Sequence, residues 1–434
     1  MKKLLLILLF LPMIGFGQQT YVPDDDFEEA LINLGLDAPP LDDYVYTSMI
    51  NTVTLLDLSN EGVNDYTGIE DFIALSIFNG NGNPASSIDL SNLTTLTEFT
   101  HENSGIVDVN LSGCNSLLEL RCESNPNLIN LDVSGCTDLT YMDCISTGLS
   151  SLNLSGLTSL EELRLAGTSS LSALNVYNCP NLNWIILTNS QVTSLDLSTN
   201  TSLLWLDIYH NQLTTLDVSN CSNLQRLLAS NNNLNSVTVT GTDLIELELH
   251  QNNLTTLDLS GLGKLSTVQA HTNSLTSVNL DGIGFTSTWN GVEIYLYYNN
   301  LTYVDASCVG YLDKLSVSNN PLISLNLQNT RNTYIGIVNA SSTSLQCVQV
   351  DDEAWSFVNW STSGSFNFGS NYNFSANCGY INCTPNSNEE MINDLESKLL
   401  KVTDVLGREA KGTENEVLFY IYDDGTVEKR IVIE

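Results

Sequence analysis

Apolar residues recur along most of the chain in one short pattern. Residues 203–213 (LLWLDIYHNQL) and 312–322 (LDKLSVSNNPL) both have Leu, Ile or Val at the first, fourth, sixth and eleventh places and Asn at the ninth. We find fourteen such coils, mostly 20 to 22 residues long, with 26 residues in one coil and 23 in another. The coils begin at Val53, Leu75, Leu96, Leu117, Leu139, Leu160, Leu182, Leu203, Leu224, Leu244, Leu265, Gly291, Leu312 and Ile335. A fixed period of this length predicts a solenoid of stacked coils.

Each coil carries a second apolar pair on its return path, as in residues 195–197 (LDL) and 216–218 (LDV). Both sides of a coil therefore direct Leu or Val inward, and so short a coil leaves no room for a full helix. One coil cannot bury its own apolar side, whereas stacked coils can. We expect a β-rich solenoid of about fourteen coils, with a parallel sheet on one face and short strands or turns on the other.

The pattern in residues 203–213 and 312–322 resembles the leucine-rich repeat, in the short bacterial form whose two halves are both repeat-like. The resemblance covers residues 53–352. It implies a leucine-rich-repeat solenoid with a binding or adhesion surface on a secreted protein, and it is nearly silent on the ligand.

Asparagine occupies the ninth place in eight coils. These residues are Asn83, Asn125, Asn211, Asn232, Asn252, Asn273, Asn299 and Asn320. An amide both donates and accepts hydrogen bonds, so it can satisfy backbone groups in the turn that leaves each strand. We interpret this column as structural rather than catalytic.

The first residues predict export. Lys2 and Lys3 precede an apolar stretch over residues 4–14, and residues 15–17 (GFG) place small side chains before a cleavage site at Gln18. Residues 1–17 are therefore predicted to be a signal peptide; a buried N-terminal helix is the alternative.

Residues 18–52 are expected to form an N-terminal cap with a short helix. The acidic residues 24–26 (DDD) precede apolar residues near helical spacing, and acidic side chains favour a helix start. A calcium loop is the alternative for this acidic run, although the spacing does not fit an EF-hand.

The repeat is lost near the C-terminus. Residues 353–383 are rich in aromatic side chains, Ser and Asn, and we expect a C-terminal cap. Residues 384–397 are polar and are typical of a linker. Residues 398–434 contain six of the 14 basic residues and alternate as strands, with a hairpin signal at Asp424-Gly425. They predict a small antiparallel β module, with strands over 399–405, 418–422 and 427–433.

This tail resembles the C-terminal sorting domain of proteins exported by the type IX secretion system of Gram-negative bacteria. The similar residues are 401–409 (KVTDVLGRE) and 420–433 (YIYDDGTVEKRIVI). The resemblance implies that residues 398–434 engage the type IX secretion machinery. In that family the tail is usually removed, and the protein is released or attached to surface lipopolysaccharide. The expected location is therefore extracellular, either free or on the outer surface of the cell.

Composition narrows the classes of partner. Fifty acidic residues face 14 basic ones, which gives a formal net charge of −36 and argues against binding to nucleic acid or to an anionic membrane. Hydrophobic residues make up 42% of the chain and charged residues only 15%, so the chain is not a disordered acidic polymer. After the signal peptide no apolar run reaches the roughly 18 residues of a membrane helix.

Catalytic motifs are missing from the sequence. It has no HExxH, GxSxG or P-loop motif. Pairs of carboxylates arise from the stacking of repeat columns alone, so their spacing is no evidence for a glycosidase. We expect a monomer that is not an enzyme and has no cofactor or metal site.

Ten cysteines in an exported chain raise the question of disulfides. Cys122 and Cys144 share the inward sixth place of adjacent coils, while four others share a late place near the turn. Those four are Cys114, Cys136, Cys179 and Cys221. Buried Cys behaves as a small apolar side chain, so we expect free core thiols. The alternatives are Cys114–Cys136 and Cys122–Cys144 bridges between coils.

In the C-terminal cap we expect a disulfide between Cys347, which ends the last coil, and Cys378, which ends the aromatic segment. Pairing of Cys378 with Cys383 is the competing possibility.

Side chains at the second, third, fifth, seventh and eighth places point outward from the main sheet, and equal places stack about 5 Å apart. Trp184 and Trp205 share the third place in adjacent coils. A contiguous aromatic patch on a surface often marks a binding site. The predicted ligand-binding residues are Trp184, Trp205, Tyr209, Tyr295 and Tyr297, with Arg164 and Arg226 as polar anchors. The alternative is ordinary packing between coils.

Two other outward groups have simpler interpretations. His250 and His271 share the seventh place and could bind a metal or respond to pH, but no carboxylate or thiol completes a metal shell. We interpret them as ordinary surface histidines. Arg121, Asp143 and Arg164 alternate in sign along one column, which predicts a modestly stabilising charge ladder.

On the opposite side, the fifteenth place of most coils holds Asp, Asn or Thr. The residues are Asp89, Asn110, Asp132, Asn153, Asn175, Asp196, Asp217, Thr238, Asp258, Asn279, Asp305 and Asn326. Such side chains stabilise turns. Calcium bridging of the aspartates is the less favoured alternative.

These features together predict a secreted or cell-surface binding or adhesion protein that recognises a protein or a glycan through its sheet face. The alternative is a passive structural component of a surface layer without a specific ligand.

Overall fold

The computed structural model describes residues 17–285, 291–329, 332–360, 364–379, 399–403, 417–422 and 427–431. The chain divides into two compact units, Met1–Gly379 and Tyr380–Glu434. The predicted signal peptide, except Gly17, and the predicted linker lie outside the described residues. Within the described part, no helix has the length and apolar character needed to cross a membrane.

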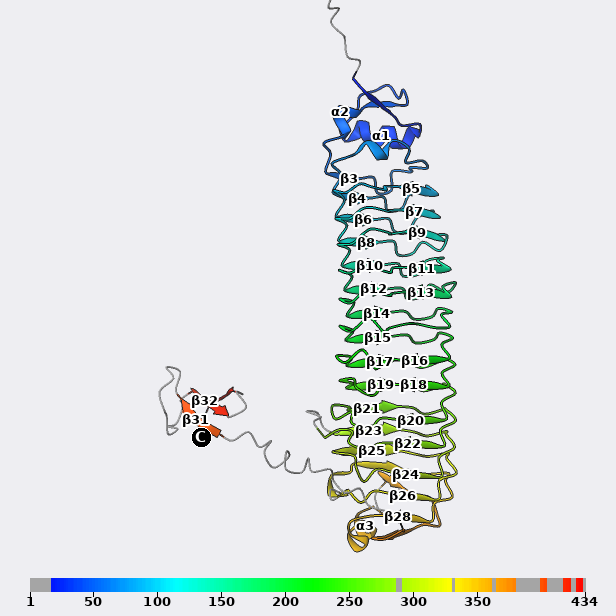
Figure 1. The fold of residues 1–434 in the computed structure, drawn as a ribbon, viewed down its shortest axis with the longest axis vertical. Coiled ribbons are helices and arrows are strands. Elements are labelled where there is room, and N and C mark those ends of the chain that lie inside the picture. Colours follow the sequence, from blue (N-terminus) through cyan, green and yellow to red (C-terminus); the bar gives the residue numbers. More distant parts are fainter. Residues whose placement is uncertain are drawn as a thin grey trace, which may run out of the picture. The chain divides into compact units, whose positions relative to one another are not determined.

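The first unit is a solenoid built on one long parallel sheet, called here the main sheet (Figure 1). It contains 15 strands among the described residues, and each coil contributes one strand in chain order. The strands are β3 (Leu55–Asp57), β4 (Ile77–Asn79), β6 (Glu98–Thr100), β8 (Glu119–Arg121), β10 (Tyr141–Asp143), β12 (Glu162–Arg164), β14 (Trp184–Ile186), β15 (Trp205–Asp207), β17 (Arg226–Leu228), β19 (Glu246–Glu248), β21 (Thr267–Gln269), β23 (Val292–Tyr295), β25 (Leu312–Ser316), β27 (Ile337–Asn339) and β29 (Phe366–Asn367). The predicted parallel sheet is confirmed.

Short strands form the opposite side of the coils, called here the second face (Figure 1). They pair in parallel into small separate sheets. The strands are β5 (Ser87–Asp89), β7 (Asp108–Asn110), β9 (Asn130–Asp132), β11 (Ser151–Asn153), β13 (Ala173–Asn175), β16 (Thr215–Asp217), β18 (Ser236–Thr238), β20 (Thr256–Asp258), β22 (Ser277–Asn279), β24 (Tyr303–Asp305), β26 (Ser324–Asn326), β28 (Cys347–Gln349) and β30 (Asn373–Ser375). The prediction of short strands or turns on this side is also confirmed.

The apolar places of the repeat fill the space between the two faces. In one coil Leu203, Leu206 and Ile208 are fully buried, and Leu213 and Leu216 complete the interior from the return path. The same places are buried in nearly every coil, so the solenoid has one continuous core. Burial of aliphatic side chains contributes about 1.5–3 kcal/mol each, which is why stacking stabilises coils that are unstable alone.

The ninth-place asparagines bind each coil to the one before it. The Asn232 amide group donates to the carbonyls of Ile208 at 2.9 Å and Ala229 at 3.2 Å. Its Oδ1 accepts the backbone N–H of Leu213 at 3.1 Å. Asn211, Asn252, Asn299 and Asn320 make equivalent bonds. The structural interpretation of this column is confirmed.

Carboxylates and amides at the fifteenth place close the turns of the second face. Asp217 Oδ1 accepts the backbone N–H of Ser219 at 2.9 Å, and Asp258 Oδ1 accepts that of Ser260 at 3.0 Å. Nearly every coil repeats this bond to the residue two positions later. The polar column is thus explained by local turn geometry.

The N-terminal residues cover the first coil with two helices and a two-stranded sheet. Their elements are β1 (Gln19–Tyr21), α1 (Asp25–Asn33), β2 (Tyr44–Tyr46) and α2 (Thr47–Ile50). The first coil itself contains the 3-10 helix η1 (Ile69–Asp71). Asp24 caps helix α1, because its Oδ1 accepts the backbone N–H of Phe27 at 2.9 Å. Phe27 is fully buried against the solenoid core. The antiparallel pairing of β1 with β2 was not expected from the sequence.

The C-terminal end of the solenoid differs from the expectation that the repeat stops before residue 353. After helix α3 (Glu353–Trp360), β29 joins the main sheet and β30 joins the second face. Aromatic side chains replace leucine in this last level, where Trp360 and Phe368 are buried. The leucine pattern therefore ends one level before the strand pairing does. A short 3-10 helix, η2 (Asn332–Tyr334), precedes β27.

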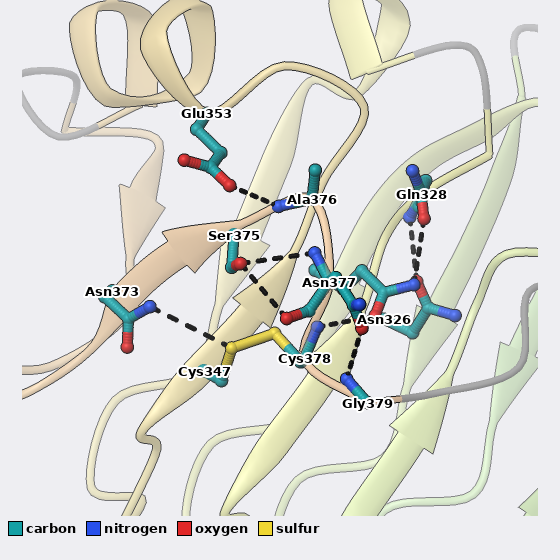
Figure 2. Close-up of a disulfide and its surroundings, with 11 residues drawn as sticks. Asn326, Gln328, Cys347, Glu353, Asn373, Ser375, Ala376, Asn377, Cys378 and Gly379 are labelled. Atoms are coloured by element: carbon teal, nitrogen blue, oxygen red, sulfur yellow. Dashed lines mark hydrogen bonds between the residues drawn. A yellow bond between two sulfur atoms is a disulfide. The ribbon is translucent and has the colours of Figure 1, made fainter.

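A disulfide joins Cys347 in β28 to Cys378 after β30 (Figure 2). This is the pair that the sequence favoured. It rules out pairing of Cys378 with Cys383, which lies outside the described residues. The bridge links the last leucine-bearing level to the aromatic one.

The core cysteines named above are free and buried, and the predicted free thiols are confirmed. Several Sγ atoms donate to a carbonyl of the preceding coil, as Cys114 does to Leu90 and Cys136 does to Leu111. Burial raises the pKa of Cys114 to about 11 and that of Cys136 to about 12. These thiols are therefore neutral packing groups at physiological pH.

The second unit contains the predicted antiparallel module. Strands β31 (Leu399–Thr403), β32 (Val417–Tyr422) and β33 (Val427–Ile431) form one antiparallel sheet in that order. The predicted hairpin turn at Asp424-Gly425 lies outside the described residues.

Candidate functional site

The outward surface of the main sheet, called here the sheet face, carries the predicted ligand-binding residues. Parallel strands pair in register, so Trp184 lies beside Trp205 and Trp205 lies beside Arg226. The side chain in the middle of each strand points into the core, whereas its two neighbours point outward. The outward side chains are half-buried rather than fully exposed, because neighbours in each column cover one another.

Three side chains form what we call the tryptophan stack: Trp184, Trp205 and Arg226. The indole rings of Trp184 and Trp205 have centroids 4.4 Å apart and planes 11° from parallel. The guanidinium carbon of Arg226 lies 4.2 Å from the ring centroid of Trp205. Trp205 is thus enclosed between an aromatic ring and a cation, an arrangement that stabilises both contacts.

Arg226 is also held by a carboxylate on the following strand. Its Nε donates to Glu246 Oε2 at 2.5 Å, and its Nη2 forms an ion pair with the same oxygen. The role of Arg226 as a polar anchor for a ligand stays a prediction, but the side chain already has partners within the protein. Its charge is already neutralised, and its position is fixed by Trp205 and Glu246.

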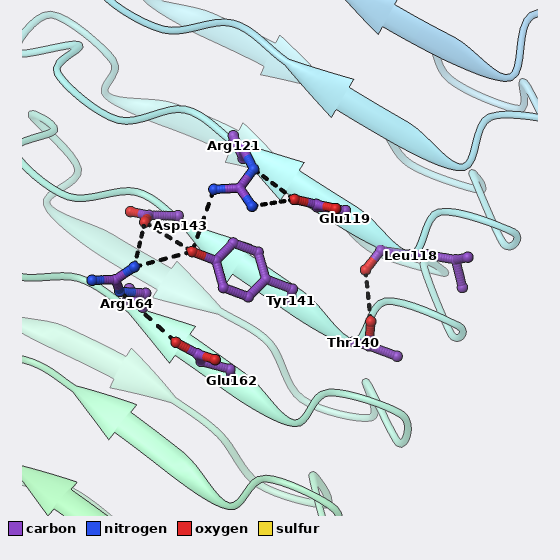
Figure 3. Close-up of polar contacts among 8 residues, drawn as sticks. All are labelled: Leu118, Glu119, Arg121, Thr140, Tyr141, Asp143, Glu162 and Arg164. Atoms are coloured by element: carbon purple, nitrogen blue, oxygen red, sulfur yellow. Dashed lines mark hydrogen bonds and ion pairs between the residues drawn. The ribbon is translucent and has the colours of Figure 1, made fainter.

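Arg164 belongs to a separate polar network (Figure 3). Its strands β8, β10 and β12 precede β14 in the main sheet. The phenol of Tyr141 lies between two guanidinium groups, 3.2 Å from Arg164 Nη1 and 3.5 Å from Arg121 Nη1. Its hydroxyl donates to Asp143 Oδ2 at 3.2 Å. Asp143 is almost fully buried and pairs with Arg164 at 3.5 Å.

Two further carboxylates complete this network. Glu119 pairs with Arg121, and Glu162 Oε1 lies 3.9 Å from Arg164 Nε. The hydrogen bond to Tyr141 is the main reason why the pKa of Arg164 is raised above its ordinary value. The alternating charges predicted for Arg121, Asp143 and Arg164 thus form a connected network, centred on a tyrosine that the sequence did not single out.

A second aromatic column, called here the histidine stack, contains His250, His271 and Tyr297. The rings of His250 and His271 have centroids 4.6 Å apart, and those of His271 and Tyr297 are 4.2 Å apart, with planes 16° and 8° from parallel. Burial, and then the neighbouring His250, lower the pKa of His271 to about 4. Burial also lowers the pKa of His250. Both imidazoles are therefore neutral near pH 7.

This geometry does not favour a metal site. Stacked imidazoles direct their ring nitrogens along parallel planes instead of toward one point between them. His250 Nδ1 is engaged with Ser230 Oγ at 2.8 Å, and His271 Nδ1 with Thr272 Oγ1 at 3.1 Å. Among the described residues there is no group of three or more His, Cys, Asp or Glu side chains that could hold a metal ion.

The predicted binding residues fall into two groups. Tyr209 follows β15 on the same coil as Trp205 and is 38% exposed. Tyr297 belongs to the histidine stack, and the Tyr295 hydroxyl donates to Glu293 Oε2 at 2.7 Å. Strands β17, β19 and β21 separate β15 from β23 in the main sheet. The structure therefore does not bring Tyr295 and Tyr297 next to the two tryptophans.

The fifth-place column lies beside the tryptophan stack, and its acidic residues Asp207 and Glu248 were not predicted as part of the site. In this column Asp207, Leu228 and Glu248 lie side by side on β15, β17 and β19. Burial raises the pKa of Asp207. Burial, followed by the charges of Glu246 and Asp207, raises the pKa of Glu248. Column spacing alone could have placed these residues together, but it could not show that their charges are only partly compensated.

A groove of about 680 Å³ lies on the second face, near the N-terminal cap. It is lined by residues of β5, β7, β9 and β11 and by residues between positions 65 and 70. Five carboxylates line it, from Asp65, Glu70, Asp89, Asp108 and Asp132. It contains none of the predicted binding residues.

Comparison with known proteins identifies the fold. No protein-family model and no curated protein matches the sequence. Among solved structures, the chain is similar to the functional domain of InlJ from Listeria monocytogenes, described as including a cysteine ladder. That match has a TM-score of 0.51 and 24% identity and covers 78% of each chain.

Two other solved structures are similar over most of their length. One is an internalin, InlF, from Listeria monocytogenes, with a TM-score of 0.40, 20% identity, and coverage of 82% of this chain and 96% of that one. The other is the leucine-rich-repeat protein LIC12759 of Leptospira interrogans, with a TM-score of 0.40, 17% identity, and coverage of 81% and 95%.

Proposed function

We propose that this protein is a secreted or cell-surface leucine-rich-repeat protein that recognises another macromolecule, a protein or a glycan, through its sheet face. The observation that carries the proposal is the tryptophan stack. Two indole rings on the outer surface of a sheet are costly to leave in water, and aromatic and arginine side chains are enriched where proteins bind one another.

The surroundings of the stack extend this surface. Leu204, next to Trp205, is 40% exposed, and Tyr209 on the same coil is 38% exposed. Ile186 and Leu228 contribute half-buried apolar side chains from the neighbouring strands. The result is an apolar area with the carboxylate of Asp207 between Ile186 and Leu228. An apolar centre with polar groups around it is the usual anatomy of a binding surface.

The same surface is rigid before any ligand arrives. Its side chains project from hydrogen-bonded strands and are held by stacking and ion pairs. A preformed surface loses little conformational entropy on binding, which favours affinity.

Our proposal for the location of the protein rests on the signal peptide and the sorting domain predicted from the sequence. The signal peptide predicted over residues 1–17 would direct it across the inner membrane. The tail at residues 398–434, with its similarity to type IX sorting domains, would direct it across the outer membrane. We propose that the solenoid then acts as a monomer outside the cell, either free or attached to the cell surface.

The test is binding of the full chain to arrays of extracellular proteins and of oligosaccharides, with the Trp184→Ala/Trp205→Ala variant alongside. We expect saturable binding by the native chain and a loss of at least tenfold in affinity for the variant. Leu118→Ala, which truncates a side chain 45% exposed at the second place of a distant coil, is the matched control and should bind normally.

The second candidate is a passive component of a surface layer. It is favoured by the side-by-side packing of the outward columns, in which aromatic rings cover one another as ordinary surface packing would. It predicts no saturable ligand on either array and equal behaviour of the native chain and the tryptophan variant.

A further inference from the structure

Two aromatic rings of the sheet face, those of Trp205 and His271, do not offer their flat faces to a ligand. Trp184 covers one face of Trp205, and Arg226 covers the other. In the histidine stack, His271 is enclosed in the same way between His250 and Tyr297. The stacking direction runs from strand to strand, so the ring edges are what point away from the sheet.

This orientation favours a protein over a sugar as the ligand. A sugar ring binds aromatic residues by placing its C–H groups on the electron-rich face of an exposed ring. At Trp205 and His271 both faces are occupied by neighbouring side chains. The nitrogen atoms of Trp184 and Trp205 are buried, so the accessible indole edges present C–H groups. Such edges pack well against aliphatic or aromatic side chains of a protein.

Beside the tryptophan stack, two carboxylates are separated by one apolar side chain. Asp207, Leu228 and Glu248 occupy equal places on three consecutive strands, so the carboxylates are two strand spacings apart, about 10 Å. Asp207 Oδ1 accepts the backbone N–H of Tyr209 at 3.2 Å, and Glu248 Oε1 accepts from Gln269 Nε2 at 2.9 Å. Among the residues that the structure describes, neither carboxylate forms an ion pair.

Unlike Asp207 and Glu248, the basic side chains described on the sheet face form ion pairs within the protein. Arg226 is paired with Glu246, Arg164 with Asp143, and Lys314 with Glu293. The described cations of the sheet face are therefore already neutralised from within, while Asp207 and Glu248 remain for a partner. Both carboxylates are half-buried, so an added cation would be attracted more strongly than on an open surface.

We propose that the sheet face takes a protein partner that packs an apolar side chain on Leu228 and the indole edges, between basic side chains that pair with Asp207 and Glu248. The inference rests on the proposed function and narrows its ligand to a polypeptide segment that is both basic and apolar. Charge complementarity with a chain of net charge −36 supports the same choice by steering a basic partner toward the solenoid.

The test uses the full chain as bait for a displayed library of random twelve-residue peptides, and an array of neutral oligosaccharides in parallel. We expect enriched peptides in which Lys or Arg flanks an aliphatic or aromatic residue. For these peptides the Asp207→Asn/Glu248→Gln variant should bind at least tenfold more weakly, and the loss should shrink as salt is raised.

The matched control is Asp217→Asn/Asp258→Asn on the second face. It removes the same charge, and both aspartates accept a turn N–H just as Asp207 does. Affinity should change by no more than about twofold, an effect of the size expected from net charge alone. Thermal unfolding of both variants checks that the solenoid is intact.

Four results would overturn the inference. They are enriched peptides without basic residues, an equal loss in the control, an absence of enriched peptides, and saturable binding of a neutral oligosaccharide that the Trp184→Ala/Trp205→Ala variant abolishes. If Trp184→Ala/Trp205→Ala loses peptide binding and Asp207→Asn/Glu248→Gln does not, the sheet face is the binding surface but the prediction of a basic partner is wrong. If neither variant changes binding, the proposed face itself is wrong.

Discussion

Trp184 and Trp205 are 21 residues apart in the sequence, yet their indole rings are stacked with centroids 4.4 Å apart. The contact exists because both residues occupy the third place of a coil, and parallel strands of adjacent coils pair in register. A repeat period thus converts widely spaced residues into a continuous surface. The two tryptophans differ in their surroundings, because Trp205 also lies against Arg226.

This difference predicts unequal effects on stability. Trp205→Ala removes an aromatic contact and a cation–π contact and should lower the free energy of unfolding by about 2 kcal/mol. Trp184→Ala removes one ring contact and should cost about 1 kcal/mol. Denaturant unfolding of the two variants measures both values. Equal losses would show that Arg226 contributes nothing to holding Trp205.

The ninth-place asparagine column makes a second prediction. Asn232→Ala removes three hydrogen bonds to backbone groups inside the solenoid and should cost about 2–4 kcal/mol, because those groups stay buried without partners. The exposed neighbour Asn233 is the control, and Asn233→Ala should change stability by less than about 0.5 kcal/mol. Similar values for both variants would contradict the structural role of this column.

Much of the fold can be predicted from the sequence because every coil repeats the same pattern of buried and exposed positions. Leu206 and Ile208 are buried on either side of the polar Asp207, which is the alternation of a strand with one buried side. Asn232 marks the turn that follows its strand. The other coils have the same pattern, so the repeat period alone predicts which residues pair between neighbouring strands of the main sheet.

The last level of the solenoid, which contains β29 and β30, could not be predicted from the leucine pattern. Phe366 and Asn373 begin β29 and β30, but no leucine pattern marks them. Their strands form because Trp360 and Phe368 fill the interior in place of leucine and cover the last coil. Such packing depends on how the aromatic side chains fit together in three dimensions, which the leucine repeat does not predict.

The candidate site was predictable to the same extent. Column spacing placed Trp184 beside Trp205, but the prediction also grouped Tyr295 and Tyr297 with them, although three strands separate β15 from β23. Column spacing did not show that ring faces are covered or that Arg226 is paired with Glu246, because both depend on side-chain rotamers. The partner class inferred for the sheet face therefore depends on the structure and not on the sequence.

A buried histidine gives the solenoid a specific response to acid. His101 is fully buried, with Nε2 3.1 Å from the Tyr66 hydroxyl and Nδ1 2.6 Å from Ser104 Oγ. Burial lowers the pKa of His101 from 6.5 to about 4. The unfolded chain therefore binds a proton below about pH 6.5 that the folded chain takes up only near pH 4.

The sign of this linkage means that His101 lowers stability as pH falls from 6.5 toward 4, by roughly 3 kcal/mol in total. His101→Gln keeps an amide in the site but does not titrate. Between pH 7 and 4 it should lose about 3 kcal/mol less stability than the native chain. Urea unfolding at a series of pH values measures the difference, with exposed His210→Gln as control. Parallel pH profiles for the native chain and His101→Gln would refute the prediction.

The disulfide predicts local stability at the C-terminal end of the solenoid. Cys347 and Cys378 enclose a loop with a sequence separation of 31. Closing a loop of this length is worth about 3–4 kcal/mol by reducing the entropy of the open chain. Cys347→Ala/Cys378→Ala should therefore speed amide hydrogen exchange in β30 and leave that of β15 unchanged. Equal protection of β30 in both proteins would show that aromatic packing alone holds this level.

The claim on which the account depends is that recognition occurs on the sheet face and not on the second face. A bulky polyethylene glycol group attached through Leu204→Cys would cover the exposed side chain beside Trp205, and the same group on Thr215→Cys would cover the second face of the same coil. The most direct measurement is the binding of both modified proteins to the array targets of the native chain. The account predicts that the group at position 204 abolishes binding and that the group at position 215 leaves it intact; binding that survives at 204 and is lost at 215 would contradict it.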